Sequence, residues 1–221
     1  MYDASYTDNL GNYKLVRIKE CYPYALKMTR DEDGTLHPSA DDGKAFDAAK
    51  KRLIAAYQKN NALFSLEGLA NVIANTSDIY EANGTVYIVS VYMNGRTFTE
   101  HQGDTLHDCV SLLIGAAKAL RHIHNAGYLY LDLKPDNILT LEGSLDLVQL
   151  FDFDSIISTE EFEKALQNNN PSELRISYTK GYASLEQQTG KLRQLGKHSD
   201  IYSLGAVLFY ALWHKTPSAF D

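Results

Sequence analysis

The chain has 221 residues, of which 44% are hydrophobic and 22% are charged, and its formal net charge at pH 7 is −7. This composition predicts a soluble globular protein of one large domain or two small lobes, and the acidic balance argues against a general nucleic-acid binder. Two cysteines without metal-ligand spacing fit a reduced, cytoplasmic setting. No signal peptide is visible, and the apolar run 201–213 is too short to cross a bilayer, so we expect no membrane segment within this chain.

The first hundred residues predict a small sheet with one helix. Residues 13–28 alternate and are rich in Tyr, Val and Leu, which predicts two strands joined by a turn near Glu20–Pro23, and residues 29–43 read as a loop. Asn83-Gly84 lies between two β-branched and aromatic runs and predicts a hairpin, because both turn residues must take positive φ. A helix is expected over 45–61, where apolar side chains recur at three- and four-residue steps: Phe46, Ala49, Leu53 and Tyr57.

The second half predicts helices around a few short strands. Short strands are expected in YLYLDL and in SLDLVQLFDFDSI, a helical piece near 160–167, and a buried helix that runs to Trp213 with Ser199 or Asp200 as its cap. A long helix is expected over 106–126, ended by Gly127. Its predicted apolar face consists of Leu106, Val110, Leu113, Ala117 and Leu120.

A group of polar residues at loop ends carries the candidate chemistry. Asp132 and Asn137 share one loop, and Asp152 follows an apolar strand. Carboxylate and amide oxygens suit a hard cation, and an acid without a metal role could accept a proton. Lys27 lies among apolar neighbours in YALK, where it must find an anion or extend to water. A lysine, oxygen ligands and a spare carboxylate are what phosphoryl transfer requires.

These segments, in their order, resemble the motifs of the protein kinase family. YLDLKPDN is similar to the catalytic loop H-R-D-x-x-x-x-N, with Tyr130 and Leu131 in place of His and Arg. Asp152-Phe153-Asp154 resembles D-F-G, YALK resembles the strand motif V-A-I-K, TKGYASLEQ the end of an activation segment, and DIYSLG the start of the buried αF helix. The resemblance covers about residues 10–221.

The fold that this resemblance implies is α+β with two lobes. The N-lobe, 1–94, is expected to be β-rich with a short or missing first strand, and the C-lobe, 95–221, to be mainly helical. The helices that complete the large lobe in the family do not follow the αF segment, so we expect a fragment with an incomplete C-lobe.

The activity that the resemblance implies is that of a bacterial-type serine/threonine protein kinase, with ATP, Mg²⁺ and a protein substrate. Asp132 is the implied catalytic base, Lys134 reaches the transferred phosphate, and Thr179 braces the substrate site. Asn137 and Asp152 are the implied magnesium ligands, and Asp200 is expected to bond the catalytic-loop backbone. The implied nucleotide-binding residues are Lys27 at the phosphates, Gly11 in the phosphate-covering loop, Ser90 as gatekeeper, and Val91 and Met93 in the hinge.

Several positions depart from the family pattern. Only Gly11 fits the G-x-G-x-x-G loop, and it also fits an ordinary turn. The central helix offers Gln58, Asn60 and Asn61 where the family has a Glu, and the nearest acid is Glu67. Leu131 replaces the arginine that would hold a phosphorylated activation loop, so control of that kind is not expected.

Two alternative functions stay open. A pseudokinase or scaffold would fit the weak glycine loop and the missing helix Glu. A small-molecule kinase would share the Asp-x-x-x-x-Asn loop, although Lys134, TKGYASLEQ and DIYSLG favour a protein substrate. The sequence does not predict the oligomeric state.

Overall fold

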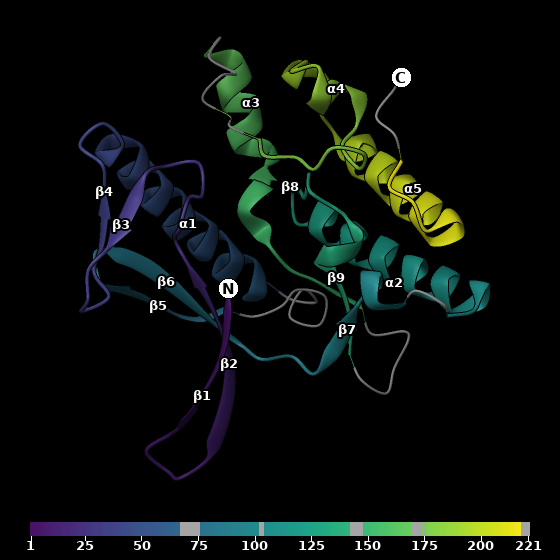
Figure 1. Cartoon of the computed structure of the whole chain (residues 1–221). Coiled ribbons are helices and arrows are strands. Elements are labelled where there is room, and N and C mark those ends of the chain that lie inside the picture. The colour runs from purple at the N-terminus through teal and green to yellow at the C-terminus, as the bar shows by residue number, and fades with distance from the viewer. Residues whose placement is uncertain (67–75, 102–103, 142–147, 169–173, 175, 218–221) are drawn as a thin grey trace. The chain divides into compact units, whose positions relative to one another are not determined.

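The computed structural model describes residues 1–66, 76–101, 104–141, 148–168, 174 and 176–217. The chain divides into two compact units, residues 1–62 with 74–93 and residues 63–73 with 94–221 (Figure 1). The first is β-rich and the second mainly helical, as the predicted fold class requires. The elements of the first unit are β1 (Tyr2–Thr7), β2 (Tyr13–Glu20), β3 (Met28–Arg30), β4 (Leu36–Pro38), α1 (Gly43–Phe64, whose last two residues belong to the second unit), β5 (Thr76–Ala82) and β6 (Thr85–Val91).

An antiparallel sheet of order β1-β2-β6-β5 forms the body of the first unit. The predicted hairpin is confirmed, because β5 and β6 meet at Asn83 and Gly84, which have φ of 50° and 72°. The predicted helix is also confirmed and is slightly longer at both ends than 45–61. It packs on the sheet through a core of Cys21, Leu36, Phe46, Ala49, Leu53, Val86 and Ile88.

Three expectations for the first unit are wrong. Residues 24–27 form no strand, because the chain turns after Pro23 and the Leu26 N–H donates to the Pro23 carbonyl over 3.0 Å. The expected loop 29–43 contains the β3–β4 hairpin. A strand of six residues, β1, pairs with β2 along its whole length where a short or missing first strand was expected.

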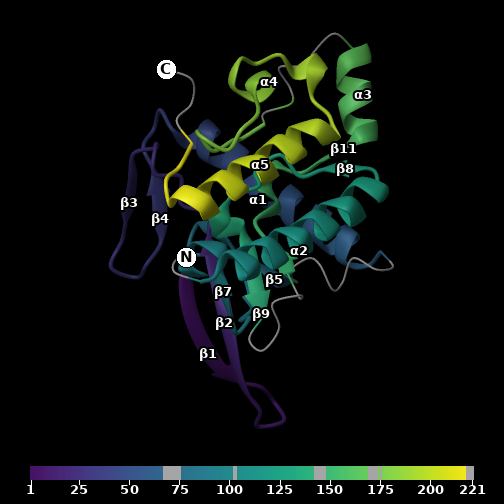
Figure 2. The ribbon, with the colours of Figure 1, turned by 90° about the vertical axis from the view of Figure 1, so that its right-hand side faces the viewer.

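The second unit is built around two helices that run side by side, α2 and α5 (Figure 2). Thr105 caps α2 reciprocally with Asp108, and Gly127, at φ 82°, follows its end as predicted. The described elements of this unit are β7 (Gly95–Thr97), a 3-10 turn (Phe98–His101), α2 (Leu106–Asn125), β8 (Tyr128–Leu129), a 3-10 turn (Pro135–Asn137), β9 (Ile138–Leu141), β10 (Val148–Leu150), a 3-10 turn (Phe153–Ser155), β11 (Ile157–Ser158), α3 (Thr159–Gln167), α4 (Leu185–Gln188), a 3-10 turn (Leu192–Gln194) and α5 (Lys197–Trp213).

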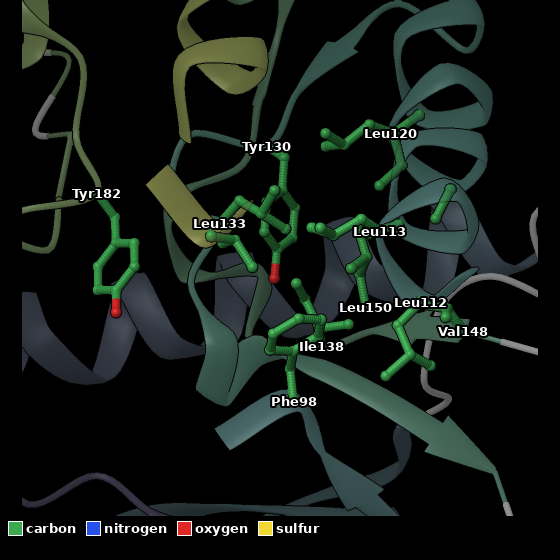
Figure 3. Packing of buried hydrophobic residues seen from close by; sticks show 14 of the residues in the cluster. Phe98, Leu112, Leu113, Leu120, Tyr130, Leu133, Ile138, Val148, Leu150 and Tyr182 are labelled. Carbon is green, nitrogen blue, oxygen red and sulfur yellow. The ribbon is translucent and has the colours of Figure 1, made fainter. Parts of the chain in front are cut away.

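The strands of the second unit pair in two small antiparallel sheets. β7, β9 and β10 form one antiparallel sheet, and β8 pairs with β11. The core between α2 and these strands contains Leu112, Leu120, Tyr130, Ile138 and Leu150 (Figure 3). None of the helices in the described part of the chain is long and apolar enough to span a membrane.

Two expectations for the helices of this unit need correction. Leu113 and Leu120 of the predicted face of α2 are buried, but Leu106 and Val110 are 60% and 40% exposed, because the buried face is centred on Leu112 and Ala116. The cap of α5 is Gly196, so Ser199 and Asp200 lie inside the helix. Ser199 Oγ accepts the Gly196 N–H over 3.2 Å, which satisfies one donor at the helix start.

Candidate active site

The centre of the candidate site is the Asp132 carboxylate, which is held at both oxygens. Thr179 Oγ1 donates to Oδ1 over 2.7 Å, and Lys134 Nζ donates to Oδ2 over 2.9 Å. Lys134 Nζ also lies 3.1 Å from Thr179 Oγ1, so the three side chains form a closed triangle. The Asp132 and Lys134 side chains keep 13% and 20% exposure. The carboxylate is therefore oriented by its neighbours and still reachable from solvent.

Asp200 supports the same loop from inside α5. Its side chain is fully buried, and it accepts the Leu131 N–H over 2.7 Å and the Tyr130 N–H over 3.0 Å. His124 Nε2 lies 2.7 Å from the same carboxylate. The expected bond from Asp200 to the catalytic-loop backbone is confirmed. His124 is buried beside Asp200, so its role is structural.

Hydrogen bonds to backbone carbonyls link Asn137 to Asp132 and the residue before Asp152 to Asn137. Asn137 is 3% exposed and donates its amide to the Asp132 carbonyl over 2.9 Å. The Phe151 N–H bonds the Asn137 carbonyl over 3.3 Å, which brings Asp152 next to it. One carboxylate and one amide oxygen suit Mg²⁺, which binds through few protein ligands together with substrate phosphates.

Tyr130 takes the place of the motif histidine and joins the loop to the strand before Asp152. Its side chain is 1% exposed, and its hydroxyl donates to the Phe151 carbonyl. Figure 3 shows the ring among the core side chains Leu113, Leu133 and Ile138. Burial, followed by the charges of the nearby acids, raises the pKa of Tyr130 well above its usual value, so the phenol stays neutral.

The placement expected for Lys27 is wrong. Lys27 is exposed and lies in the loop before β3, where its backbone N–H donates to Asp42 Oδ2 over 3.0 Å. The central strand β2 instead carries Val16-Arg17-Ile18-Lys19, which matches V-A-I-K at three of four positions. Lys19 is half-buried and pairs in register with Ile88 of β6. The motif is thus also present at residues 16–19, and Lys19 is a candidate that sequence reasoning missed.

The turn that contains Gly11 is already filled by an acid of the chain. Gly11 has φ 83° and joins β1 to β2. Asp8 Oδ1 accepts the N–H groups of Leu10 and Asn12 over 2.9 Å each, and the Asp8 carbonyl accepts the Gly11 N–H. These amides are the groups that would bind phosphate, and a carboxylate repels it. These contacts fit the turn interpretation of Gly11, and its role in a phosphate-covering loop stays a prediction.

The remaining residues that were expected to bind the nucleotide lie at the end of β6 in the first unit. Ser90 pairs with Arg17 and Val91 with Val16, and Met93 follows the strand. Val91 is 49% exposed. α1 contains no Glu, and its one acid, Asp47, is exposed and lies 3.1 Å from Lys50. Glu67 lies outside the described residues.

Glu186, which has an arginine partner in the family, is held here by neighbours from the start of α5. Its carboxylate accepts from Ser199 Oγ over 2.6 Å and lies 3.4 Å from His198 Nε2. Burial alone would raise the pKa of Glu186, but the hydrogen bonds from Ser199 and Ser184 outweigh it and lower the pKa. Ser199 and His198 thus fix the segment end to α5.

Known proteins resemble this chain in sequence and in structure. A family model described as a protein kinase domain matches residues 44–220. "Serine/threonine-protein kinase D" of Synechocystis sp. is 28% identical over 135 residues, which cover 61% of this chain and 26% of that protein. "Serine/threonine-protein kinase PknA" of Nostoc sp. is 28% identical over 172 residues, which cover 75% of this chain and 29% of that protein.

A solved structure described as "PpkA-294 apo form" superposes with a TM-score of 0.69 and 27% identity. The superposition covers 95% of this chain and 69% of that one, and it confirms the fold class expected from the sequence. The chain spans less than a third of the length of either curated relative.

Proposed function

Because the chain belongs to the protein kinase family, we propose that it transfers the γ-phosphate of ATP to Ser or Thr hydroxyls of protein substrates. The observation that carries this proposal is the closed triangle of Asp132, Lys134 and Thr179. The lysine two residues after the aspartate is the pattern of the serine/threonine branch, and both curated relatives named above carry that description.

Each residue of the triangle has a separate role in the phosphoryl transfer. Asp132 orients the attacking hydroxyl and accepts its proton, since both carboxylate oxygens are fixed and the side chain is reachable. Lys134 places a positive charge beside the transferred phosphoryl group. Thr179 bonds the same carboxylate and so attaches the substrate-side segment, residues 179–187, to Asp132.

Asn137 and Asp152 are the residues that would hold Mg²⁺. When bound, the metal neutralises the charge that develops on the phosphate oxygens. Asn137 is fixed by its bond to the Asp132 carbonyl, so the proposed metal ligand and the proposed base keep their positions relative to each other. In the first unit we assign the phosphate contact to Lys19, and the adenine contacts to the region of Ser90, Val91 and Met93. A cytoplasmic location is part of the same proposal, and the buried thiols Cys21 and Cys109 support it.

A pseudokinase is the second candidate. It is favoured by α1, which has no Glu to pair with the strand lysine, and by the Gly11 turn, whose amides bond Asp8. A protein of this kind would bind nucleotide or partners without turnover.

One experiment separates the two candidates. The chain is incubated with magnesium, ATP and casein, and mass spectrometry locates added phosphate while calorimetry measures ATP binding. Phosphate on Ser or Thr that is lost in Asp132→Asn supports the kinase. ATP binding without any transfer supports the pseudokinase, and phosphate only on added choline or aminoglycosides would point to a small-molecule kinase.

A further inference from the structure

Gln187 is a buried polar residue that the sequence motifs leave without a role. It follows Glu186 in α4, is 4% exposed, and its Nε2 donates to the Leu131 carbonyl over 2.7 Å. That carbonyl belongs to the peptide bond that joins Leu131 to Asp132. The two residues of the hydrogen bond are 56 positions apart in sequence.

The direction of the Gln187 amide is fixed at its other end. Oε1 accepts the Ser184 N–H over 3.0 Å and lies 3.1 Å from the Ser184 hydroxyl oxygen. A reversed amide would set two donors against each other at Ser184 and two acceptors against each other at Leu131. Nε2 is therefore the atom that faces the carbonyl.

Leu131 needs such support because its backbone is strained. It has φ 65°, a left-handed conformation that a leucine keeps only when its surroundings hold it there. Asp200 holds its N–H, and Gln187 holds its carbonyl. Its side chain is buried in a cluster with Leu129, Ile157, Phe162 and Leu195.

The segment from Thr179 to Gln187 thus holds Asp132 at two points. Thr179 bonds the carboxylate, and Gln187 bonds the carbonyl of the preceding residue. Rotation of the Leu131–Asp132 peptide plane would move the Asp132 side chain away from Thr179 and Lys134. We propose that Gln187 is a positioning residue that fixes this peptide plane and so couples docking of the substrate-side segment to the orientation of the base. This inference rests on the proposed kinase function.

The chain supplies a matched control in the next residue. Gln188 Nε2 also donates to a backbone carbonyl over 2.7 Å, but its partner is Ala183, five positions away, and the bond does not involve the Asp132 loop. Gln187→Met and Gln188→Met each remove one such bond to a carbonyl with little change in side-chain volume, and Gln187→Met also removes the acceptor of the Ser184 N–H. Gln187→Glu keeps the shape and replaces the donor with an acceptor that repels the carbonyl.

The test measures phosphate transfer to casein and backbone hydrogen exchange in peptides that cover 128–134. We expect Gln187→Met to lower kcat about 10- to 100-fold with KM for ATP unchanged within about twofold, and Gln187→Glu to lower it further. The amides of Tyr130 and Leu131 should exchange about tenfold faster in both variants, while Gln188→Met stays near the parent chain.

Equal kcat and equal exchange in Gln187→Met and Gln188→Met would overturn the proposal. So would a loss of kcat accompanied by faster exchange throughout the second unit, since that result describes general destabilisation. If the parent chain transfers no phosphate, the proposed function fails, and the exchange comparison alone decides whether Gln187 holds the peptide plane.

Discussion

The two units differ in how completely they keep the residues that phosphoryl transfer needs. In the second unit, Asp132, Lys134, Thr179 and Asn137 are joined by hydrogen bonds of 2.7 to 3.1 Å. In the first unit, the strand lysine is present as Lys19, but α1 offers no Glu and the Gly11 turn is closed by Asp8. The sheet and helix of the first unit are present, and its departures from the family pattern concern residues expected to contact the nucleotide.

This difference separates the part of the candidate site whose internal contacts are kept from the part that lacks motif residues. In the second unit, residues that differ from the family motif still make hydrogen bonds around Asp132 and the segment end. Tyr130, in place of histidine, bonds the Phe151 carbonyl, and Ser199, in place of an arginine partner, bonds Glu186. The first unit loses motif residues without a visible replacement among the described residues. We therefore expect substitutions in the second unit to have the larger effects, and the following variants test that order.

The largest effect is expected at the base. Asp132→Asn keeps the side-chain shape but cannot accept a proton, so we expect the transfer rate to fall about 100- to 10,000-fold. Rates of casein phosphorylation measure the change. Glu163→Gln alters an exposed carboxylate of α3 and serves as the control. A rate for Asp132→Asn within tenfold of the control would remove Asp132 from the mechanism.

A large loss of stability is expected at Gly181, which lies two residues after Thr179 and has φ 92°. A Cβ there would come within 2.5 Å of Thr216 Cγ2 and 2.7 Å of the Pro217 carbonyl oxygen. Gly181→Ala should lower the free energy of unfolding by about 3 kcal/mol. Gly190→Ala, at φ 66° with no atom within 4 Å, should cost about 1 kcal/mol. Urea denaturation compares the two, and equal losses would contradict close packing at Gly181.

A moderate effect is expected at the strand lysine of the first unit. Lys19→Met removes a half-buried charge from the central strand and should lower kcat/KM for ATP about 10- to 100-fold. Lys27→Met removes an exposed lysine of a loop and should change kcat/KM for ATP less than about twofold. Steady-state kinetics measure both variants. A larger effect of Lys27→Met than of Lys19→Met would support YALK as the segment that matches V-A-I-K.

The smallest effect concerns Glu20 and acid stability. Its side chain is 4% exposed and accepts hydrogen bonds from Arg30, Tyr2 and Tyr87 over 2.7 to 3.1 Å. Burial alone would raise the pKa of Glu20, but these bonds, led by that from Arg30, lower it. Because the folded-state pKa lies below the unfolded value, the stabilisation is present above about pH 4.3 and is lost as the pH falls through the folded pKa.

Glu20→Gln should therefore flatten the acid limb of the stability curve by about 1 kcal/mol. Urea unfolding at about pH 3 and about pH 6 measures the difference between the variant and the parent chain. Parallel curves for the two proteins would show that Glu20 has the same pKa in the folded and unfolded states.

Local signals in the sequence predicted those parts of the fold that depend on neighbouring residues. Asn83-Gly84 predicted the β5–β6 hairpin, and the apolar repeat predicted α1, because turn chemistry and helical periodicity act over a few positions. The family resemblance correctly identified the protein kinase family and the α+β fold. It also pointed to Asp132 and Thr179, whose contact spans 47 positions and has no local signal.

The errors arose where two interpretations of one pattern compete. YALK and VRIK both contain apolar residues before a lysine, and only the pairing of β2 with β6 shows which one lies in the sheet. α2 is apolar on more than one face, so periodicity alone could not decide between Val110 and Leu112 as the buried residue. Gln187 was not singled out because its partner, the Leu131 carbonyl, is a backbone atom that leaves no trace in the sequence pattern.

Because Tyr130 stands where the kinase motif has a histidine, one part of the candidate site does not change its charge in acid. A histidine in this position would change its charge near pH 6.5, within the range that cells experience. The pKa of the buried Tyr130 phenol lies well above its ordinary value, so the hydroxyl keeps its proton and continues to donate to the Phe151 carbonyl. The catalytic loop and the strand that leads to Asp152 should therefore keep their spacing in neutral and in acid-stressed surroundings alike.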